Sequence, residues 1–401
     1  MRDVVIISAV RTPIGSIGGT LKNVSPEYLA KTALEGALNK VTFDHALIDE
    51  VIIGQTKQTT DAPNIARLAT LMTDIPVEVP AYTVHRQCAS GMQAIVNAML
   101  QIKAGFSDIL LVGGVESMST APFYIRNARF GVGSGNTVFV DPNIESQPKS
   151  QPNDRYGVFN MIQTADTVAD QYNVTREAQD AFANNSQIKA IKAIDEGRFN
   201  DEIVPVILKG RKGSETVFDT DEYPKRDTNI DKLYALKPIF KGGTVTAGNA
   251  SGRNDGASAL LIMSADKAAD LGLKPLCRIM DATTVGVDPR IMGIGPVPAT
   301  RKLLKKLDMT IDDFGLVEIN EAFAAQSVAC QNELNIDIDR LNVNGGAIAL
   351  GHPLGCSGAR ISTTLIHEMK KRNVQYGLAT ICVAGGLGMA IAFENIESEK
   401  G

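Results

Sequence analysis

Two distant parts of the sequence repeat the same succession of segments, and this internal repeat constrains the fold more than any other feature. Three pairs of segments match: LIDEVIIGQ (47–55) with IDDFGLVEIN (311–320), CASGMQAIVNAML (88–100) with CSGARISTTLIHEM (356–369), and ILLVGG (109–114) with LATICVAGG (378–386). The spacing agrees as well, since 33 residues separate Gln55 from Cys88 and 32 separate Asn320 from His352. We therefore expect two copies of one layered unit, with chance similarity between two α/β halves as the alternative.

Apolar residues alternate between helical and strand spacing along the chain. Residues 28–40 have helical spacing, and residues 48–54 form a short apolar run typical of a buried strand. After Cys88 we predict a helix that ends at Gly105. Its apolar residues are Met92, Ile95, Val96, Met99 and Leu100. Residues 108–114 are apolar on both faces, as in a strand covered from both sides. The pattern predicts the α/β class with a buried central sheet.

The region between the two copies has a different composition. Residues 131–157 are rich in Gly, Pro, Asn and Ser, which indicates a long irregular segment. A helix is predicted over residues 175–196, with Gly197 as its stop. Long insertions of this kind usually serve as lids or substrate loops. We place the N-terminal half at residues 1–118 and 247–270, the inserted loop domain at 119–246, and the C-terminal half at 271–401.

Composition and charge exclude several classes of function. The 401 residues carry a formal net charge of −5, which gives no electrostatic reason to expect a nucleic acid or an anionic membrane as partner. No apolar run reaches the roughly 18 residues of a membrane span, and the start lacks the profile of a signal peptide. Five cysteines without Cys-x-x-Cys spacing, and only 4 histidines, argue against a disulfide framework and a metal site. We expect a cytoplasmic protein with reduced thiols.

Cys88 occupies an unusual position for a cysteine that only packs in a core. It follows the short apolar segment 81–84 and opens the small-residue turn Ala89-Ser90-Gly91 in front of the predicted helix. The positive end of a helix favours a thiolate, and small residues let a ligand approach backbone N–H groups. A nucleophile and a buried structural cysteine are both compatible with this position. His85 is expected to point to the opposite face of its strand and to be structural.

Other reactive side chains stand at the ends of predicted strands. His352 lies in the turn GGAIALGHPLGCSGAR (345–360), whose glycines leave space against the backbone, and its imidazole can act as a general base. Cys382 and Asn320 each stand at the end of a predicted strand. A cysteine in the position of Cys382 is more often a core residue than a catalytic one. Open α/β sheets collect their ligands at the carboxyl ends of strands. We therefore expect the two halves to bring Cys88 together with His352, Cys382 and Asn320.

Six blocks of the sequence resemble those of thiolases, in the order and spacing of that family. They are RQCASGMQA (86–94), VTAGNASGRNDGA (245–257), MGIGPVPA (292–299), NEAFAAQ (320–326), NGGAIALGHPLGCSGAR (344–360) and CVAGGLG (382–388). The resemblance covers almost the whole chain, from residue 4 to residue 395. It implies a thiolase-like duplicated five-layered α/β/α/β/α fold with an inserted loop domain.

The resemblance also implies roles for the reactive residues. Cys88 matches the nucleophile that carries the acyl group as a thioester, and His352 matches the base that activates it. Cys382 matches the acid/base for the α-carbon of the second acyl-CoA, and Asn320 the residue that holds a water in the hole for the enolate oxygen. The N–H groups of Cys88 and Ala384 would bind the thioester oxygen. Two thiols and one histidine can divide acyl transfer and carbanion formation between them.

By the same resemblance, the substrate is an acyl-CoA. The expected contacts are Ala247 and Ser251 on the pantetheine arm, Lys225 near the nucleotide, and Met161, Met292 and Ala384 beside the acyl group. The implied activity is that of an acetyl-CoA C-acetyltransferase, which reversibly condenses two acetyl-CoA to acetoacetyl-CoA and CoA. A degradative 3-ketoacyl-CoA thiolase of broader chain length is the alternative. Coenzyme A is part of the substrate, so no cofactor or metal is expected, and the family implies a homo-oligomer, either a dimer or a homotetramer.

Two departures from the family pattern and three rival classes bear on this interpretation. Asn160 stands where the family often has His, and Ala384 replaces a glycine, so that its methyl group would narrow the acyl site.

A ketoacyl synthase shares the two-half architecture but has no need of Cys382. A non-catalytic relative that binds CoA or lipid would have lost one of the reactive residues, and none is missing from this sequence. A cysteine protease would need neither the duplicated α/β fold nor a second thiol. The turn around His352 lacks the G-x-G-x-x-G spacing of a dinucleotide loop.

Overall fold

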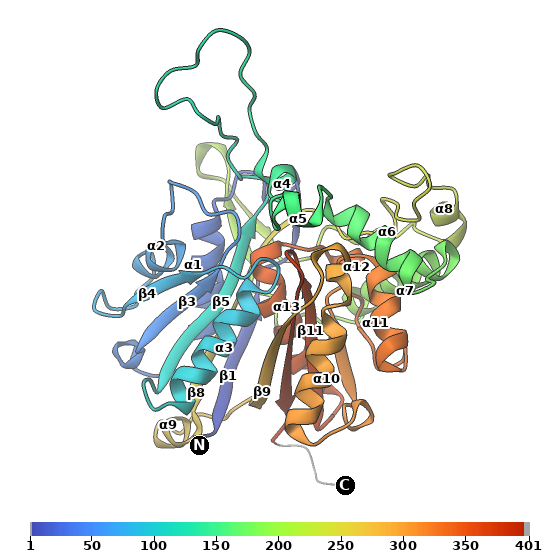
Figure 1. Ribbon diagram of the computed structural model, residues 1–401. Helices are drawn as coiled ribbons and strands as arrows, with labels where there is room; N and C mark the ends of the chain where they lie inside the picture. The colour runs from blue at the N-terminus through green and yellow to red at the C-terminus, as the bar shows by residue number, and fades with distance from the viewer. Residues whose placement is uncertain (1, 397–401) are drawn as a thin grey trace.

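Two similar half-sheets are joined edge to edge in the computed structural model, which describes residues 2–396 (Figure 1). The strand order is β10-β11-β12-β9-β1-β8-β5-β3-β4, and the short β2 (Gly15–Ser16) pairs with β8. The other strands are β1 (Val4–Arg11), β3 (Glu50–Gly54), β4 (Ala81–Val84), β5 (Ile109–Ser117), β8 (Asn254–Ser264), β9 (Cys277–Gly286), β10 (Leu316–Ile319), β11 (Tyr376–Val383) and β12 (Leu387–Glu394). The halves meet where β1 pairs with β9, through Val5 with Arg278 and Ile6 with Cys277.

The two half-sheets have the same order and direction of strands, which confirms the predicted duplication. In the N-terminal half, β3 and β5 are parallel, whereas β5–β8 and β8–β1 are antiparallel. In the C-terminal half, β10 and β11 are parallel, whereas β11–β12 and β12–β9 are antiparallel. β4 lies parallel to β3, and its counterpart is an isolated parallel bridge between Val317 and Leu341. The carboxyl ends of β3, β5, β10 and β11 therefore occupy equivalent places in the two copies.

Helices cover both faces of each half-sheet. The outer pairs, α1 with α2 and α10 with α11, pack on the N-terminal and C-terminal halves respectively, and α3 with α13 lies between the half-sheets. Their bounds are α1 (Pro26–Leu38), α2 (Ile65–Leu71), α3 (Ser90–Lys103), α10 (Pro296–Leu307), α11 (Ala324–Leu334) and α13 (Leu354–Lys371). The short α9 (Ala265–Asp270) and α12 (Ala347–Leu350) complete the two halves. The result is the expected α/β/α/β/α order of layers.

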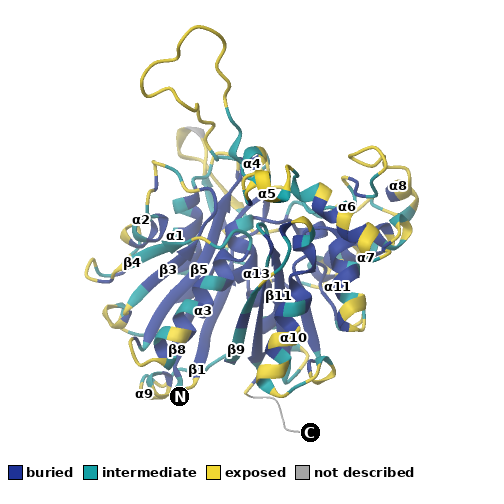
Figure 2. Cartoon of the chain, viewed as in Figure 1, coloured by how far each residue is buried: buried dark blue, intermediate teal, exposed yellow. Residues whose placement is uncertain are grey.

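Side-chain alternation explains why each half-sheet needs two helical layers. In β5, Leu110 and Val112 pack in the core with the central helices, whereas Ile109 and Leu111 pack with α1 and α2. A strand that is apolar on both faces must be covered on both sides, and Figure 2 shows these strands buried. Leu100 differs from its prediction as a packed residue of α3. Its side chain is 55% exposed, because the packed face of α3 is narrower than the apolar pattern of the sequence.

Glycines let the two central helices approach each other closely. A Cβ atom added at Gly358 of α13 would lie 2.6 Å from the backbone N of Met92, and one added at Gly91 of α3 would lie 2.9 Å from that of Ala359. The glycines of segment 345–360 leave space against the backbone, as predicted, and the protein's own atoms fill that space beside Gly345, Gly346, Gly351, Gly355 and Gly358. This packing places the starts of α3 and α13 side by side.

The inserted segment lies over the end of the sheet at which the central helices start (Figure 1). It contains α4 (Pro142–Glu145), α5 (Asn153–Tyr156), α6 (Met161–Gln171), α7 (Arg176–Asp195), β6 (Val206–Lys209), β7 (Glu215–Phe218) and α8 (Ile230–Tyr234). As predicted, α7 is N-capped by Thr175 and ends before Gly197, whose φ is +66°. Residues 124–140 form an exposed loop that projects from the body. The boundaries of the halves and of the insertion stay predictions.

The helices of the described residues can also be compared with the length of a membrane span. None of them is long and apolar enough to cross a bilayer.

Candidate active site

A cavity of about 310 Å³ lies where the starts of α3 and α13 meet the inserted segment. Most of the predicted site residues line it: Cys88, His352, Cys382, Ala384, Ala247, Ser251, Met161 and Met292. Cys88 comes from the N-terminal half, His352 and Cys382 from the C-terminal half, and Met161 from the insertion. The duplicated fold and its insertion thus build one site together.

The backbone around Cys88 holds the thiol at the cavity wall. Gln87 has a φ of +45°, a conformation that costs energy for a residue with a side chain. The Ser90 hydroxyl stabilises this turn, because it accepts the N–H of Arg86 at 2.8 Å and donates to the carbonyl of Gln87 at 2.6 Å. Cys88 consequently lines the cavity and is half-buried, whereas the other four cysteines are buried.

The protonation state of Cys88 differs from the sequence expectation. Burial raises the pKa of its thiol to about 11, while the Ala384 N–H and the Lys57 ammonium act in the opposite direction. Helix α3 begins at Ser90, so Cys88 lies just before its positive end, but burial outweighs the effects that favour a thiolate. The thiolate that this position favours is therefore not the stable form in the free protein, and the predicted activation by His352 is still needed. The thiol is neutral at pH 7, and its attack on a thioester needs a base.

His352 is fixed in the form that such a base requires. Its backbone N–H donates to Asn254 Oδ1 at 2.9 Å, and its Nδ1 lies 2.6 Å from Ser357 Oγ. The Ser357 hydroxyl donates to the Pro353 carbonyl at 2.9 Å, so it accepts a hydrogen bond from Nδ1–H, and Nε2 keeps a free lone pair. Burial and the nearby charge of Arg360 lower the pKa of His352 to about 3, which keeps the ring neutral.

Cys382 stands at the end of β11 and is 1% exposed. Burial, and then the charge of Cys88, raise the pKa of its thiol well above the usual value. The two thiols are thus close enough for their charges to interact, as their common cavity requires. Two neighbouring thiols that disfavour simultaneous ionisation can act in separate steps, one as a nucleophile and the other as a proton carrier.

Asn320 lies behind the lining of the cavity. It is fully buried, and its backbone N–H donates to the Thr380 carbonyl at 3.0 Å. Among the described residues, neither side-chain atom of Asn320 has a hydrogen-bond partner, and the same holds for His352 Nε2. Buried polar atoms are normally paired, so these atoms are available to a bound group. Ala322 and Phe323, which follow Asn320, do line the cavity.

Two further predicted positions lie outside the lining. Lys225 is exposed, with its ammonium 4.9 Å from the ring centre of Tyr223, which does line the cavity. Asn160 caps α6, because its side chain accepts the N–H of Gln163 at 3.0 Å while the Gln163 side chain accepts its N–H. The departure from the family at position 160 is therefore explained by helix capping, and the next residue, Met161, points into the site.

His85 does not lie on a strand, contrary to the expectation from the sequence. His85 follows β4 rather than lying within it, and it is exposed. It lies outside the lining of the cavity that contains Cys88.

Several lining residues escaped the sequence analysis. Lys57 lies three residues after the carboxyl end of β3. In the other copy of the repeat, the equivalent region follows Asn320. Lys57 could have been found by this position, because open α/β sheets bind ligands at the carboxyl ends of their strands. The insertion adds Asn143, Ser146, Gln147, Ser150, Ile162, Tyr223 and Ile239, and its irregular sequence offers no periodicity to interpret. The two halves add Gln87, Met118, Ala250, Gly252, Arg253, Ala322, Phe323 and Leu354.

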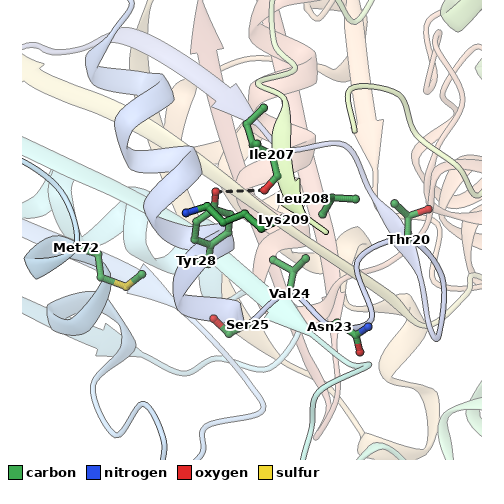
Figure 3. Close-up of a pocket in the computed structure, with 9 residues that line it drawn as sticks. All are labelled: Thr20, Asn23, Val24, Ser25, Tyr28, Met72, Ile207, Leu208 and Lys209. Atoms are coloured by element: carbon green, nitrogen blue, oxygen red, sulfur yellow. Dashed lines mark hydrogen bonds between the residues drawn. The ribbon is translucent and has the colours of Figure 1, made fainter. Parts of the chain in front are cut away.

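A larger hollow of about 420 Å³ lies elsewhere, between the start of α1 and β6 (Figure 3). The hydroxyl of Tyr28 donates to the Ile207 carbonyl at 3.3 Å on its wall. Its described lining contains Lys209 but no Cys, His, Asp or Glu, so it offers no nucleophile and base. Within the described residues, no group of His, Cys, Asp and Glu has the arrangement of a metal site either. The chemistry therefore points to the cavity around Cys88.

Comparisons with known proteins agree with this geometry. Residues 4–266 match the N-terminal domain of thiolases and residues 273–395 match the C-terminal domain. The acetyl-CoA acetyltransferase of Syntrophomonas wolfei is 46% identical over 98% of this chain and 99% of that protein. The structure is similar to that of Bacillus anthracis acetyl-CoA acetyltransferase, with a TM-score of 0.95, 46% identity and 99% of both chains covered. It is also similar to human mitochondrial 3-ketoacyl-CoA thiolase, with a TM-score of 0.93, 40% identity, and 98% and 99% coverage. The two domain matches, which together cover almost the whole chain, and the relatives of 46% identity show that this chain belongs to the thiolase family.

Proposed function

We propose that this protein is an acetyl-CoA C-acetyltransferase, which reversibly joins two acetyl-CoA to give acetoacetyl-CoA and CoA. One observation carries the proposal: the thiols of Cys88 and Cys382 line a single cavity with a neutral His352. Relatives named acetyl-CoA acetyltransferase, 45% to 47% identical over almost the whole chain, support it. The resulting enzyme is an acyltransferase that works by a ping-pong mechanism.

In the first half-reaction, His352 Nε2 takes the proton of the Cys88 thiol while the sulfur attacks the thioester carbonyl of acetyl-CoA. Burial disfavours each charge alone, but the thiolate and the imidazolium form side by side and attract each other. The N–H groups of Cys88 and Ala384 bind the developing oxyanion. The tetrahedral intermediate then expels the CoA thiolate, which takes the proton from His352, and the acetyl group remains on Cys88.

In the second half-reaction, the Cys382 thiol passes its proton to the neutral His352 and, as the thiolate, removes a proton from the methyl carbon of a second acetyl-CoA. The enolate oxygen is stabilised by His352, with the buried amide of Asn320 behind it. The new carbanion attacks the acetyl group on Cys88, forms the carbon–carbon bond and releases the Cys88 thiolate, which takes the proton back from His352. The only coenzyme in this scheme is the CoA carried by the substrates, and we propose no metal.

The proposed preference is for short acyl groups. Met161 and Met292 flank the cavity, and the methyl group of Ala384 lies at its wall. Overpacking a filled site costs about 1–3 kcal/mol, so rates should fall as the acyl chain grows. A degradative thiolase of broader chain length is the second candidate, favoured by the likeness to human mitochondrial 3-ketoacyl-CoA thiolase.

The test is thiolysis of 3-ketoacyl-CoA substrates with 4, 8 and 16 carbon atoms, together with condensation of acetyl-CoA. The proposal expects kcat/KM to be highest at 4 carbon atoms. A higher kcat/KM at 16 than at 4 carbon atoms would establish the degradative alternative, and absence of both reactions would remove the thiolase activity itself.

We propose a homotetramer in the cytoplasm. The outer edge of β4 has no strand partner among the described residues, which supports pairing with a second copy. The projecting loop exposes Phe130, Val138 and Phe139, which supports a second interface. The five free cysteines suit a reducing compartment. Light scattering after size-exclusion chromatography tests the assembly, and a monomeric mass would contradict it.

A further inference from the structure

Arg360 is a cation buried behind the proposed active site. It lies on α13, is fully buried, and stays outside the lining of the cavity that contains Cys88. The proposed reaction gives it no role. Burial of a charge costs several kcal/mol unless hydrogen bonds and opposite charges compensate it, so the surroundings of this guanidinium indicate what its charge is for.

Hydrogen bonds do not compensate the guanidinium. Among the described residues, its Nε, Nη1 and Nη2 atoms have no hydrogen-bond partner. The carboxyl group of Glu318 on β10 lies 4.0 Å from Nη1, and within the same part of the chain its Oε2 atom is also unpaired. Since buried polar groups are normally paired, these unpaired groups need an explanation other than stability.

Charged groups from three neighbouring segments face Arg360. They are Glu318 and Glu321 at the end of β10, Glu202 before β6, and Arg11 at the end of β1. Two of these carboxylates have partners of their own. Glu202 Oε1 accepts Arg11 Nε at 2.6 Å, and Glu321 Oε2 accepts the Ser186 hydroxyl at 2.7 Å. Both carboxylates therefore attract Arg360 while they are bonded elsewhere.

Glu318 balances the guanidinium only in part. Burial raises the pKa of its carboxyl group to about 8, although the charge of Arg360 acts in the opposite direction. At pH 7 much of this carboxyl group therefore carries a proton. The Cys356 thiol beside Arg360 is neutral as well, because burial raises its pKa to about 12. A positive charge thus remains between β10 and α13.

The position of Arg360 on α13 directs this charge toward His352. Ser357, which contacts His352 Nδ1, precedes Arg360 by three residues, so both lie on the same face of the helix. The charge of Arg360 accordingly lowers the pKa of His352, in addition to burial. The charges that act on the Cys88 thiol are instead those of Lys57 and Glu116. Arg360 therefore affects the base more than the nucleophile.

We propose that Arg360 is a positioning residue whose charge keeps His352 neutral, so that Cys88 retains its proton in the free enzyme. This inference rests on the proposed roles of Cys88 and His352. Transfer of the thiol proton to Nε2 creates a thiolate and an imidazolium, and the charge of Arg360 opposes the imidazolium. With a thioester bound, its carbonyl oxygen takes up the negative charge in the oxyanion hole. The nucleophile thus forms together with its substrate and stays unreactive toward other electrophiles.

The test measures alkylation of Cys88 by iodoacetamide in the free enzyme at pH 7, by mass spectrometry of the Cys88 peptide. Only the thiolate reacts. Arg360→Met removes the charge and should raise the rate about 10-fold or more, because each unit gained in the pKa of His352 gives ten times more of the thiolate–imidazolium pair. Arg360→Lys keeps a charge and should stay near the wild-type rate.

Glu318→Gln is the matched control, because it alters the same buried contact but removes the opposite charge. Its rate should stay at or below that of the wild type. No rise in a folded Arg360→Met variant, or a rise in Glu318→Gln, would overturn the proposal. Parallel alkylation of the buried Cys277 marks an unfolded variant, in which case Glu318→Gln decides. Thiolysis of acetoacetyl-CoA by the wild type is measured as well, since its failure would instead remove the proposed function.

Discussion

The turns that carry Cys88 and His352 are equivalent in the two halves, but only in the His352 turn does a side-chain hydroxyl hold the reactive group itself. Each turn precedes a central helix, α3 or α13, and each faces the same cavity. The Ser90 hydroxyl holds the strained turn at Gln87 through its backbone, so the half-buried thiol is placed only indirectly. Asn254 accepts the backbone N–H of His352, and the Ser357 hydroxyl holds the buried imidazole directly.

This difference follows from what the two groups must do. A nucleophile must be reached by substrate, so its turn leaves the sulfur at the cavity wall. A base must keep one tautomer, so its ring needs a fixed hydrogen-bond partner. Asn254 lies on β8 of the N-terminal half and therefore holds His352 across the junction. Duplication placed the two turns face to face, and divergence gave them different supports.

The largest effect is expected from Cys88→Ser. A hydroxyl is a far weaker nucleophile than a thiolate, so kcat should fall by about 10⁴-fold or more. Mass spectrometry after incubation with acetyl-CoA should place one acetyl group on the Cys88 peptide of the wild type and none on the variant. Cys277→Ala is the control, since this buried cysteine lies outside the cavity. Acetylation confined to another cysteine would refute the assignment of the nucleophile.

The next effect separates Cys382 from His352, two residues of the same half. Cys382→Ser should still become acetylated on Cys88 but should lose condensation by about 10²- to 10⁴-fold, because only the carbanion step needs this thiol. His352→Ala should impair both steps. Equal losses in the acetylation rate and in the overall rate of Cys382→Ser would show that Cys382 has no separate role.

Gly358→Ala tests the helix contact that brings the two turns together. The added Cβ would lie 2.6 Å from backbone, so we expect the free energy of unfolding to fall by about 1–3 kcal/mol, measured by denaturant titration. Its twin in the other copy, Gly91→Ala, should cost less because its contact is 2.9 Å. Gly133→Ala, which meets open space, is the control. If Gly358→Ala proved as stable as Gly133→Ala, the close approach of α3 and α13 would not constrain the fold.

The smallest effect is expected from Ser357→Ala, which removes the partner of His352 Nδ1. Loss of one buried hydrogen bond should lower kcat/KM about tenfold, as the ring loses its preferred tautomer and orientation. Ser362→Ala is the matched control, because Ser362 lies on the same helix and its hydroxyl donates to the Gly358 carbonyl at 2.9 Å without contacting a histidine. Full activity of Ser357→Ala would mean that the tautomer is held by other contacts.

The sequence by itself determined the layered fold and most of the residues that the fold brings to one cavity. The repeated segments, the strands apolar on both faces and the helix stops at Gly105 and Gly197 are local patterns, and each agrees with the structure. Cys88, His352 and Cys382 were identifiable because each stands where a strand ends or a helix starts, and the order of strands carries such positions to one end of the sheet.

Only the tertiary structure decided how these groups are charged and what surrounds them. Desolvation depends on atoms far apart in the chain, so the raised pKa of the Cys88 thiol could not be inferred from its neighbours in sequence. The glycines of segment 345–360 have the same freedom whether a ligand or a helix fills their space, and here the fold fills it. Lys57 is an ordinary surface-type residue by composition, and only the contact of β3 with the insertion turns it into a buried cation beside the proposed nucleophile.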